Sequence, residues 1–271
     1  MRQLVKNYEA WNEQTYGFDH TIIVWKDDGN YYQLRHSSRD GSFDLDSLPT
    51  PRPICMKIFR GRWGASLTES PCPIPADSYM KMTRIFLPDN YNPEGAGSDG
   101  PNRAPGVDIE PEAEIYEILK QHRHPNICVY YGCVRDGGYF TALCLKKYGH
   151  SLHDAVQNGD CTVDPHLVLD GISKGLHFLH TTLNLVHNDI NPTNIMLDDD
   201  GNAVIIDLDS CMPIGQEIGL FRKGGTFGWT MDPAPIISLP ENDTYGLTLI
   251  ANFLERKDTD GLSPFRGQLS E

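Results

Sequence analysis

Short runs of apolar and β-branched residues, separated by turn signals, dominate the first part of the chain. Residues 21–25 and 31–36 are two such runs, and Asp27-Asp28-Gly29-Asn30 between them is typical of a hairpin turn. A third apolar run covers residues 54–59. The pattern predicts three strands here, the first two of them paired in a hairpin.

A long polar segment follows, from residue 60 to about 108. It is rich in Pro, Gly, Ser and Asp, with the sequence PDNYNPEGAGSDGPNRAPG at its centre. Loops of this length are uncommon in a compact domain. We therefore expect an insertion at 60–108 that is partly disordered, at least in its second half.

The pattern becomes helical and then strand-like again between residues 110 and 145. Helix formers fill residues 110–121, and acidic residues open the segment, as suits the positive N-terminus of a helix. The runs 127–134 and 139–145 are strand-like and are joined by Asp136-Gly137-Gly138. The sequence thus predicts one helix followed by a pair of strands.

Helical periodicity dominates after Ser151. Asp164-Pro165 is a helix start, and the residues that follow form one apolar stripe at spacings of three and four: Val168, Ile172, Leu176 and Leu179. A short hairpin at 194–207 and a last helix at about 242–254 complete the pattern. Strands first and helices later predict an α+β fold of two lobes, residues 1–144 and 145–271, joined near residues 145–150.

Composition narrows the classes of function. The chain has 271 residues and a net charge of −14, which argues against a surface built to bind nucleic acid or anionic lipid. No apolar run approaches the ~20 residues of a membrane span, and the N-terminus lacks the apolar stretch of a secretory signal. The seven cysteines are scattered and form no C-x-x-C pair, which favours a reducing compartment, the cytoplasm or the nucleus.

The strongest candidate for chemistry is His187-Asn188-Asp189-Ile190-Asn191-Pro192-Thr193-Asn194, followed by Asp207 at the end of the next short strand. Mg²⁺ prefers oxygen ligands, and one or two side-chain oxygens together with substrate phosphates are enough to hold it. Asp189, Asn194 and Asp207 therefore indicate a site that handles a divalent cation and phosphate.

This segment resembles the protein kinase superfamily, whose catalytic loop is H-x-D-x-x-x-x-N and whose metal-binding Asp opens D-F-G. Further motifs stand in the same order: Ile54-Cys55-Met56-Lys57 resembles V-A-I-K, His124-Pro125-Asn126-Ile127 resembles H-P-N-I, and residues 242–247 resemble the start of the central helix of the C-lobe. The amino-acid sequences of these motifs most resemble those of compact fungal kinase-like proteins. The resemblance implies a bilobal fold with an antiparallel five-stranded N-lobe and a helical C-lobe, here reduced because few residues follow residue 254.

The resemblance also implies roles for individual residues. Asp189 would orient the substrate hydroxyl, Asn194 and Asp207 would hold Mg²⁺ on ATP, and Lys57 would contact the α- and β-phosphates. Either Glu112 or Glu114 would fix Lys57. We favour Glu112, because Ile115, Tyr116 and Leu119 share its face of the helix while Glu114 points about 200° away. The adenine would bind along Leu145, Lys146 and Tyr148, with Cys144 guarding the space behind it.

Several departures from the family pattern suggest low or restricted activity. The turn between the first two predicted strands is KDDGNYY, which has one glycine and two acids in place of G-x-G-x-x-G. Asn188 replaces the Arg of H-R-D, so we expect no switch by phosphorylation of the activation segment. Asn191 replaces a frequent Lys, and Asp209 replaces the Gly of D-F-G.

Three functions fit these residues. The first is ATP- and Mg²⁺-dependent phosphotransfer to a hydroxyl, for which we favour protein Ser or Thr. The second is a pseudokinase scaffold with weak or no nucleotide binding, and the third is a small-molecule kinase. Retention of Lys57, Asp189, Asn194 and Asp207 favours the enzyme. The sequence names neither a substrate nor an oligomeric state.

Overall fold

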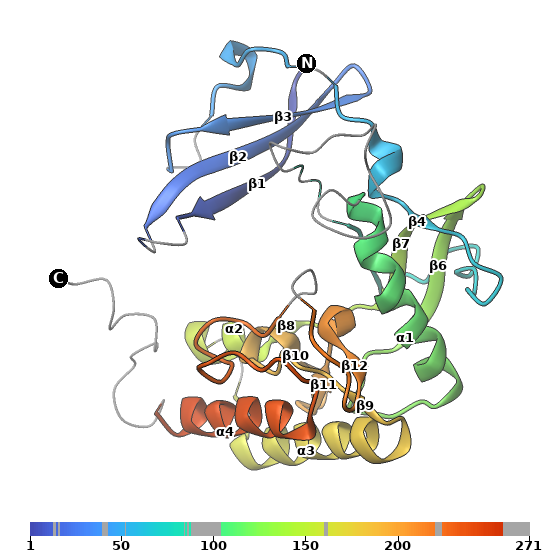
Figure 1. Cartoon of the computed structure of the whole chain (residues 1–271), viewed down its shortest axis with the longest axis vertical. Helices are drawn as coiled ribbons and strands as arrows, with labels where there is room; N and C mark the ends of the chain where they lie inside the picture. The colour runs from blue at the N-terminus through green and yellow to red at the C-terminus, as the bar shows by residue number, and fades with distance from the viewer. Residues whose placement is uncertain are drawn as a thin grey trace. The chain divides into compact units, whose positions relative to one another are not determined.

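The computed structural model describes residues 1–256 apart from residues 13, 14, 16, 40–42, 52, 84, 86, 88–103, 160, 161 and 220–223. The chain divides into two compact units. The first combines Met1–Arg62 with Met82–Asp108, and the second combines Trp63–Lys81 with Ile109–Glu271. Each unit is described on its own below, and Figure 1 labels their α-helices and most of their strands.

The first unit contains an antiparallel sheet in the order β1 (Gln3–Trp11), β2 (Phe18–Asp27) and β3 (Asn30–His36). The predicted hairpin is confirmed, since β2 and β3 pair from Thr21↔His36 to Asp27↔Asn30. Asp28 and Gly29 both have positive φ, as a tight two-residue hairpin turn requires. The sequence pattern missed β1, which pairs with the other edge of β2.

The predicted third strand at 54–59 is wrong. Ile54 makes one isolated bridge to Tyr31, and the chain then turns into the 3₁₀ helix η2 (Met56–Phe59). Phe59 is the buried residue of this turn. A short apolar run does not distinguish a strand from a buried helical turn. Two other short helical turns of this unit are η1 (Leu45–Ser47) and η4 (Pro105–Ile109), the latter ending at the start of the second unit.

The strands of the second unit belong to a different sheet, in which β5 (Ser78–Lys81) and β6 (Tyr130–Asp136) both pair antiparallel with β7 (Tyr139–Lys146). The predicted strands at 127–134 and 139–145 are therefore confirmed as β6 and β7. The predicted five-stranded N-lobe sheet is not confirmed, because among the described residues β1, β2 and β3 form one sheet and β5, β6 and β7 belong to another.

β5 lies inside the segment that the composition predicted to be an insertion. Residues 61–62 also form a short strand, β4 (Gly61–Arg62). That prediction is therefore wrong for the first part of the segment, while residues 88–103 lie outside the described residues.

The described residues of the second unit form four α-helices: α1 (Glu110–Gln121), α2 (Leu152–Asn158), α3 (Pro165–Thr182) and α4 (Pro240–Arg256). The Asp164 carboxylate caps α3 by accepting hydrogen bonds from the backbone of His166 and Leu167. The apolar stripe predicted for this helix is confirmed, because all four of its residues are buried. Figure 1 shows α3 and α4 side by side, and the two helices are in contact.

Two small sheets lie among these helices. One has the order β11 (Ala203–Ile205), β10 (Ile195–Leu197), β8 (His150–Ser151), and the other pairs β12 (Met212–Pro213) with β9 (Leu185–Val186). The predicted hairpin at 194–207 is confirmed as β10 and β11, flanked by the short turns η5 (Pro192–Asn194) and η6 (Leu208–Ser210). The catalytic-loop motif thus connects β9 to β10.

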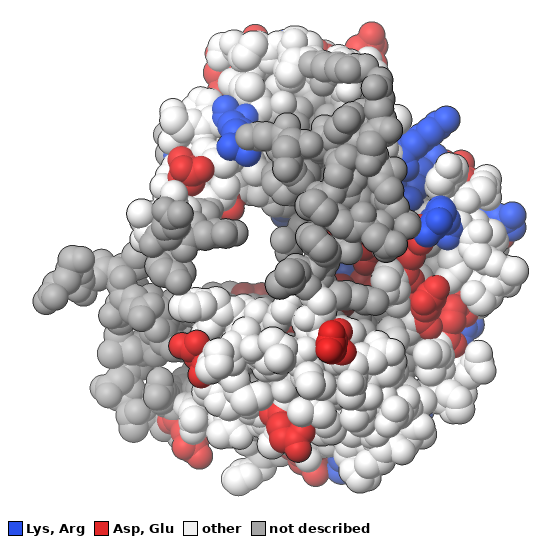
Figure 2. Space-filling view, viewed as in Figure 1, with Lys and Arg blue, Asp and Glu red and all other residues white. Residues whose placement is uncertain are grey.

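Charge on the visible face is uneven. In Figure 2, most of the surface formed by α3, α4 and the neighbouring hairpins is uncharged, and the charged side chains visible on it are mainly Asp and Glu. This agrees with the net charge of −14. Among the described residues, no helix combines the length and apolar character needed to cross a bilayer.

Candidate active site

A buried ion pair marks the centre of the candidate site. Lys81, the last residue of β5, places its Nζ 2.7 Å from Oε1 and 2.6 Å from Oε2 of Glu112 on α1. The same ammonium also donates a hydrogen bond to the carboxylate of Asp207, which follows β11. The side chain of Glu112 is 1% exposed and that of Lys81 is 22% exposed. The ion pair that joins β5 to α1 is therefore largely shielded from water.

Local structure explains why Glu112 and not Glu114 faces the lysine. Ala113, Tyr116 and Leu119 are buried on α1, whereas Glu114 is exposed. Glu112 Oε1 also accepts a hydrogen bond of 3.1 Å from the backbone N–H of Leu208. The carboxylate therefore joins α1 to the residue that follows Asp207.

The charge of the Lys81 ammonium interacts with three carboxylates, those of Glu112, Asp207 and Asp209. Burial alone would lower the pKa of Lys81, but Glu112 and Asp207 outweigh it and raise the pKa above its usual value. Burial raises the pKa of Glu112 to about 7, a shift that Lys81 opposes and that Asp207 and Asp209 increase. Burial dominates for the carboxylate because it is almost fully enclosed. The cluster carries surplus negative charge that a divalent cation would balance.

Lys57 does not occupy the position that the sequence motif suggested. It is exposed on η2, a 3₁₀ turn of the first unit, and not on a strand. The lysine that contacts Glu112 and Asp207 is Lys81, in the sequence Ser78-Tyr79-Met80-Lys81. Like Ile54-Cys55-Met56-Lys57, this tetrapeptide ends in Met-Lys. That weak similarity to V-A-I-K was the only sequence signal for Lys81, and it stands in a segment whose composition indicated a loop.

The catalytic-loop motif encloses the carboxylate of Asp189, which is 3% exposed. Its Oδ1 accepts hydrogen bonds from the backbone N–H of Thr226, at 2.8 Å, and from Nδ2 of Asn191, at 3.0 Å. Its Oδ2 accepts one from Nδ2 of Asn194 at 3.2 Å. Sequence reasoning missed Thr226, whose Oγ1 also accepts from Asn191. The Asp189 carboxylate is thus fixed in orientation from two segments of the chain.

Backbone and histidine hydrogen bonds connect Asp189 to Ile206, which lies between β11 and Asp207. The Nε2–H of His187 donates to the carbonyl of Ile206 at 2.9 Å, and its Nδ1 accepts from the backbone N–H of Asp189 at 3.2 Å. This pair of bonds requires a neutral ring protonated on Nε2. His187 is fully buried, and both of its ring nitrogens bond to the backbone. The N–H of Ile206 also donates to the carbonyl of Asn194, so Asn194 and Asp207 flank one end of the β10–β11 hairpin.

The donor atoms at this end of the hairpin suit magnesium. The side-chain nitrogen of Asn194 donates to Asp189, which leaves its oxygen as the atom able to bind a cation. Asp207 supplies a carboxylate from a left-handed backbone conformation at φ 62°. Within the described part of the chain, no three His, Cys, Asp or Glu side chains form a metal cage. Two oxygen ligands are the arrangement expected for Mg²⁺ that is shared with phosphates.

The predicted adenine-binding residues lie at the end of β7. Directly opposite residues of paired strands share one face of a sheet, and successive residues alternate between faces. Leu145 lies opposite Tyr79 and therefore shares the face of Lys81, whereas Cys144 lies opposite Met80 and faces the other way. Cys144 therefore does not share the face of Lys81, as the guarding position assigned to it would require, whereas Leu145 does.

The two remaining predicted residues, Lys146 and Tyr148, lie within three residues after Leu145. The backbone N–H of Lys146 donates to Val129, and the phenol of Tyr148 accepts from the N–H of the same Val129. The ammonium of Lys146 lies 5.4 Å from the centre of the Tyr148 ring. These contacts fasten the segment to the start of β6.

Asn188, which replaces the Arg of H-R-D, is buried and joins several segments. Its Nδ2 donates to the carbonyl of Ser210 at 3.2 Å and to Oγ of Ser238 at 2.9 Å, and its Oδ1 accepts from Asn242 at 2.9 Å. The two ends of the segment between Asp207 and α4 are therefore held by neutral hydrogen bonds.

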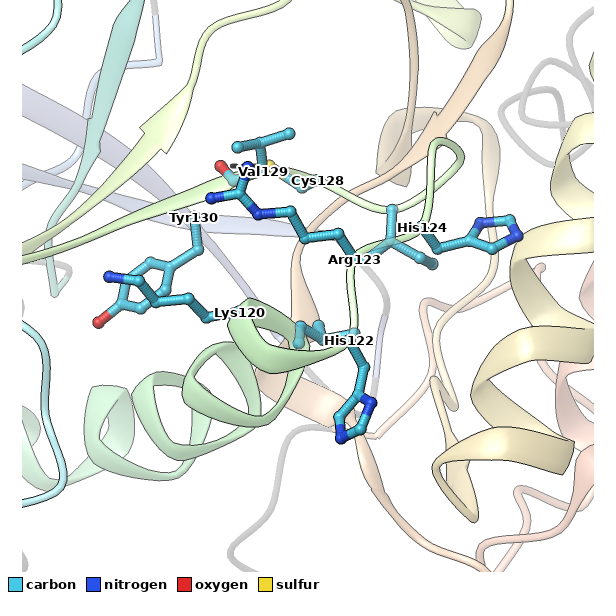
Figure 3. Close-up of a pocket in the computed structure, with 9 residues that line it drawn as sticks. Lys120, His122, Arg123, His124, Cys128, Val129 and Tyr130 are labelled. Atoms are coloured by element: carbon cyan, nitrogen blue, oxygen red, sulfur yellow. Dashed lines mark hydrogen bonds between the residues drawn. The ribbon is translucent and has the colours of Figure 1, made fainter.

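A separate small cavity of about 20 Å³ lies beyond the C-terminal end of α1. Figure 3 shows Arg123 extending from the loop toward Cys128 and Val129, and Lys120 beside the ring of Tyr130, 5.7 Å from its centre. None of the candidate site residues lines this cavity. It is distinct from the Lys81 cluster.

Comparison with known proteins agrees with this arrangement. Residues 108–233 match the family model of the protein kinase domain. The chain is 29% identical over 105 residues to human serine/threonine-protein kinase TNNI3K, which covers 37% of this chain and 13% of that protein. It is 33% identical over 98 residues to dual specificity mitogen-activated protein kinase kinase 1 of Dictyostelium discoideum, covering 34% of this chain and 15% of that protein.

Two further comparisons extend over more of the chain. Sperm motility kinase Z of Mus musculus is 26% identical over 171 residues, covering 60% of this chain and 33% of that protein. The chain thus spans between 13% and 33% of the length of these three relatives. Among solved structures, a chain of the yeast RNA Pol II CTD kinase CTDK-1 complex superposes with a TM-score of 0.46 and 16% identity, covering 52% of this chain and 48% of that one. The kinase motifs, the site they form and the family match together place residues 108–233 in the protein kinase-like superfamily.

Proposed function

We propose that this protein transfers the γ-phosphoryl group of ATP, in the presence of Mg²⁺, to a hydroxyl group of a protein Ser or Thr. The observation that carries the proposal is the contact of Lys81 with both Glu112 and Asp207. It brings a cation for phosphates and an oxygen ligand for a metal together in the unit that also contains Asp189 and Asn194.

The binding roles follow from the chemistry of each group. Lys81 would contact the α- and β-phosphates, and Glu112 would hold its ammonium in place. Asp207 and Asn194 would hold Mg²⁺, which neutralises charge on the phosphates when bound. Because Glu112 is fixed by the N–H of Leu208, the lysine and the metal ligand keep one relative position.

Asp189 would accept the proton of the substrate hydroxyl. The hydroxyl oxygen forms a bond to the γ-phosphorus, the bond from that phosphorus to the β–γ bridging oxygen breaks, and ADP leaves. Hydrogen bonds from Thr226 and Asn194 hold the Asp189 carboxylate, so positioning supplies most of the rate. Asn191, a neutral residue, stabilises the carboxylate but adds no positive charge beside the transferring group.

We expect the activity to be low. The turn at Asp27–Asn30, interpreted from the sequence as a degenerate glycine loop, connects β2 to β3 in the first unit and is not joined to the strand of Lys81. The residues that precede β5, 61–77, contain no G-x-G-x-x-G pattern either. Backbone N–H groups that would enclose the phosphates are therefore not supplied by such a loop.

The proposal is tested by comparing the two candidate lysines. We expect the wild type to bind MgATP in calorimetry and to transfer labelled phosphate to a panel of Ser- and Thr-containing peptides. Lys81→Met should lose both, because it removes the cation at the phosphates. Lys57→Met is the matched control and should retain both.

A third variant separates binding from transfer. Asp189→Asn should keep MgATP binding and lose phosphate transfer, since it changes only the group that accepts the proton. Loss of both activities in Lys57→Met, with Lys81→Met unaffected, would refute the assignment of the site. MgATP binding by the wild type without transfer to any peptide would instead indicate a pseudokinase.

A further inference from the structure

Exposed aliphatic side chains gather on a short ribbon of chain that leads into helix α4. Residues 215–218 and 236–238 run antiparallel, with an isolated bridge between Glu217 and Ile237. Ile236 is 75% exposed, Ile237 is 38% exposed, and Leu239, just before α4, is 39% exposed. We refer to these three side chains as the apolar patch. A group of large apolar residues on one surface segment is typical of a site where a partner binds.

The backbone that carries the patch is fixed to the catalytic loop. The side chain of Ser238, which is fully buried, accepts a hydrogen bond of 2.9 Å from Nδ2 of Asn188. Nδ2 of Asn242 donates to the carbonyl of Ile237 and to Oδ1 of Asn188, both at 2.9 Å. The patch is therefore held in one conformation by the residues beneath it. A surface that is already ordered loses little conformational entropy when a partner binds.

Acidic side chains surround the patch. Glu217 lies directly opposite Ile237 in the ribbon, so the two side chains share one face. Asp232 and Glu241 flank the patch in the sequence and are exposed, as Glu217 is. Residues 208–255 contain six acidic residues and two basic ones, and both basic residues lie outside the described residues. This surface would repel nucleic acid or anionic lipid and attract a cationic partner.

We propose that the apolar patch is a docking surface for a segment of a partner protein that carries Lys or Arg beside aliphatic residues. An aliphatic side chain of that segment would cover Ile236 and Ile237, and its cations would lie at Glu217 and Asp232. Charge complementarity would speed the encounter and select the partner, while the apolar contact would slow dissociation. This inference goes beyond the proposed function and does not depend on it, because neither nucleotide nor phosphate transfer enters the contact.

Fluorescence anisotropy with the full chain and three short labelled peptides tests the proposal. The first peptide alternates Arg with Leu, the second alternates Glu with Leu, and the third alternates Arg with Gln. None of them contains a hydroxyl residue, so none can be a substrate for phosphate transfer. We expect the wild type to bind the first peptide about tenfold or more tightly than either of the others.

Two substitutions locate the binding. Ile236→Ser should weaken binding of the Arg–Leu peptide about tenfold, because it removes the most exposed aliphatic side chain of the patch. Ile74→Ser is the matched control, since Ile74 is 45% exposed and lies outside the ribbon, and it should retain wild-type affinity.

Glu217→Gln should weaken binding of the same peptide and make it less sensitive to added salt. Glu114→Gln removes an exposed carboxylate from α1 and should change neither property. Thermal unfolding checks that each variant is folded, which the exposure of the four replaced side chains favours.

Several results would overturn the proposal. Equal affinity of the wild type for the Arg–Leu and Glu–Leu peptides would exclude the role of the carboxylates, and equal affinity of wild type and Ile236→Ser would exclude the patch. A wild type that dimerises in sedimentation, while Ile236→Ser stays monomeric, would assign the patch to a contact between two copies of the chain. Tighter peptide binding by Phe265→Ser would assign it to the chain's own residues 257–271, which would then compete with the peptide.

Discussion

Gly246 lies where helix α4 touches the backbone of the catalytic loop. A Cβ atom added at Gly246 would lie 2.4 Å from the carbonyl oxygen of Ile190 and 2.9 Å from its Cβ. Ile190 follows Asp189 directly, so the contact bears on the residue proposed to accept the proton. We predict that Gly246→Ala destabilises the protein and reduces phosphate transfer.

Two opposing effects set the magnitude of the loss. Alanine in a helix interior is favoured over glycine by about 1 kcal/mol. Against this, the contact must lengthen by about 1 Å to reach ordinary van der Waals distance, and such overpacking costs about 1–3 kcal/mol or more. The upper part of that range applies because the obstacle is a backbone oxygen. The same helix is also held at Asp243, whose carboxylate accepts from the N–H groups of His187 and Asn188 at 2.9 and 2.7 Å.

We therefore expect Gly246→Ala to lower the free energy of unfolding by about 1–2 kcal/mol in urea titrations. A displacement of about 1 Å at Asp189 should also slow phosphate transfer by about a hundredfold. Thr248→Ala is the control, since Thr248 is exposed on the same helix and its replacement gains helix propensity without a clash. A Gly246→Ala protein as stable as the wild type would refute the steric argument.

Two further predictions concern Asn188 and Glu112. Asn188→Leu should lower the free energy of unfolding by about 2–4 kcal/mol. The substitution leaves Ser210 and Ser238 without their buried hydrogen-bond donor and places a branched residue at positive φ. A loss below about 1 kcal/mol in urea titrations would contradict the role of this amide. Glu112 has a pKa of about 7 in the folded protein against 4.5 for an unperturbed Glu, so the stability it contributes is complete below pH 4.5 and is lost as the pH rises through 7. The change amounts to about 3 kcal/mol, and unfolding curves between pH 5 and 8 should depend less steeply on pH in Glu112→Gln; equal slopes would exclude this carboxylate as the source.

The sequence predicted those elements that can be recognised from neighbouring residues alone. The Asp28-Gly29 turn needs positive φ at both residues, and few other sequences provide it. The face formed by Tyr116 and Leu119 is set by helical geometry, which is why the orientation of Glu112 follows from the sequence alone. Asp189 and Asn194 stand in a motif long enough to be specific.

The sequence did not predict β5 or the role of Lys81, because the residues of this strand show no clear strand pattern. It has four residues, and its pairing partner β7 lies some sixty residues further along the chain. Local composition around it indicated a loop, whereas the apolar run at 54–59 looked more like a strand but forms the turn η2. Short runs are ambiguous, and contacts distant in sequence decide between their alternatives.

The side chain of Lys81 helps to explain how so short a strand is held. One edge of β5 bonds to β7, and beyond the strand the carbonyl of Asp77 accepts from the N–H of Lys147. At the other end, the Lys81 ammonium bonds to Glu112 and Asp207, which belong to a helix and a hairpin. Pairing and the ion pair therefore fix opposite ends of the strand. The residue assigned to phosphate binding is thus also part of what orders its own strand, and this dependence on distant carboxylates leaves no periodic signal in the sequence.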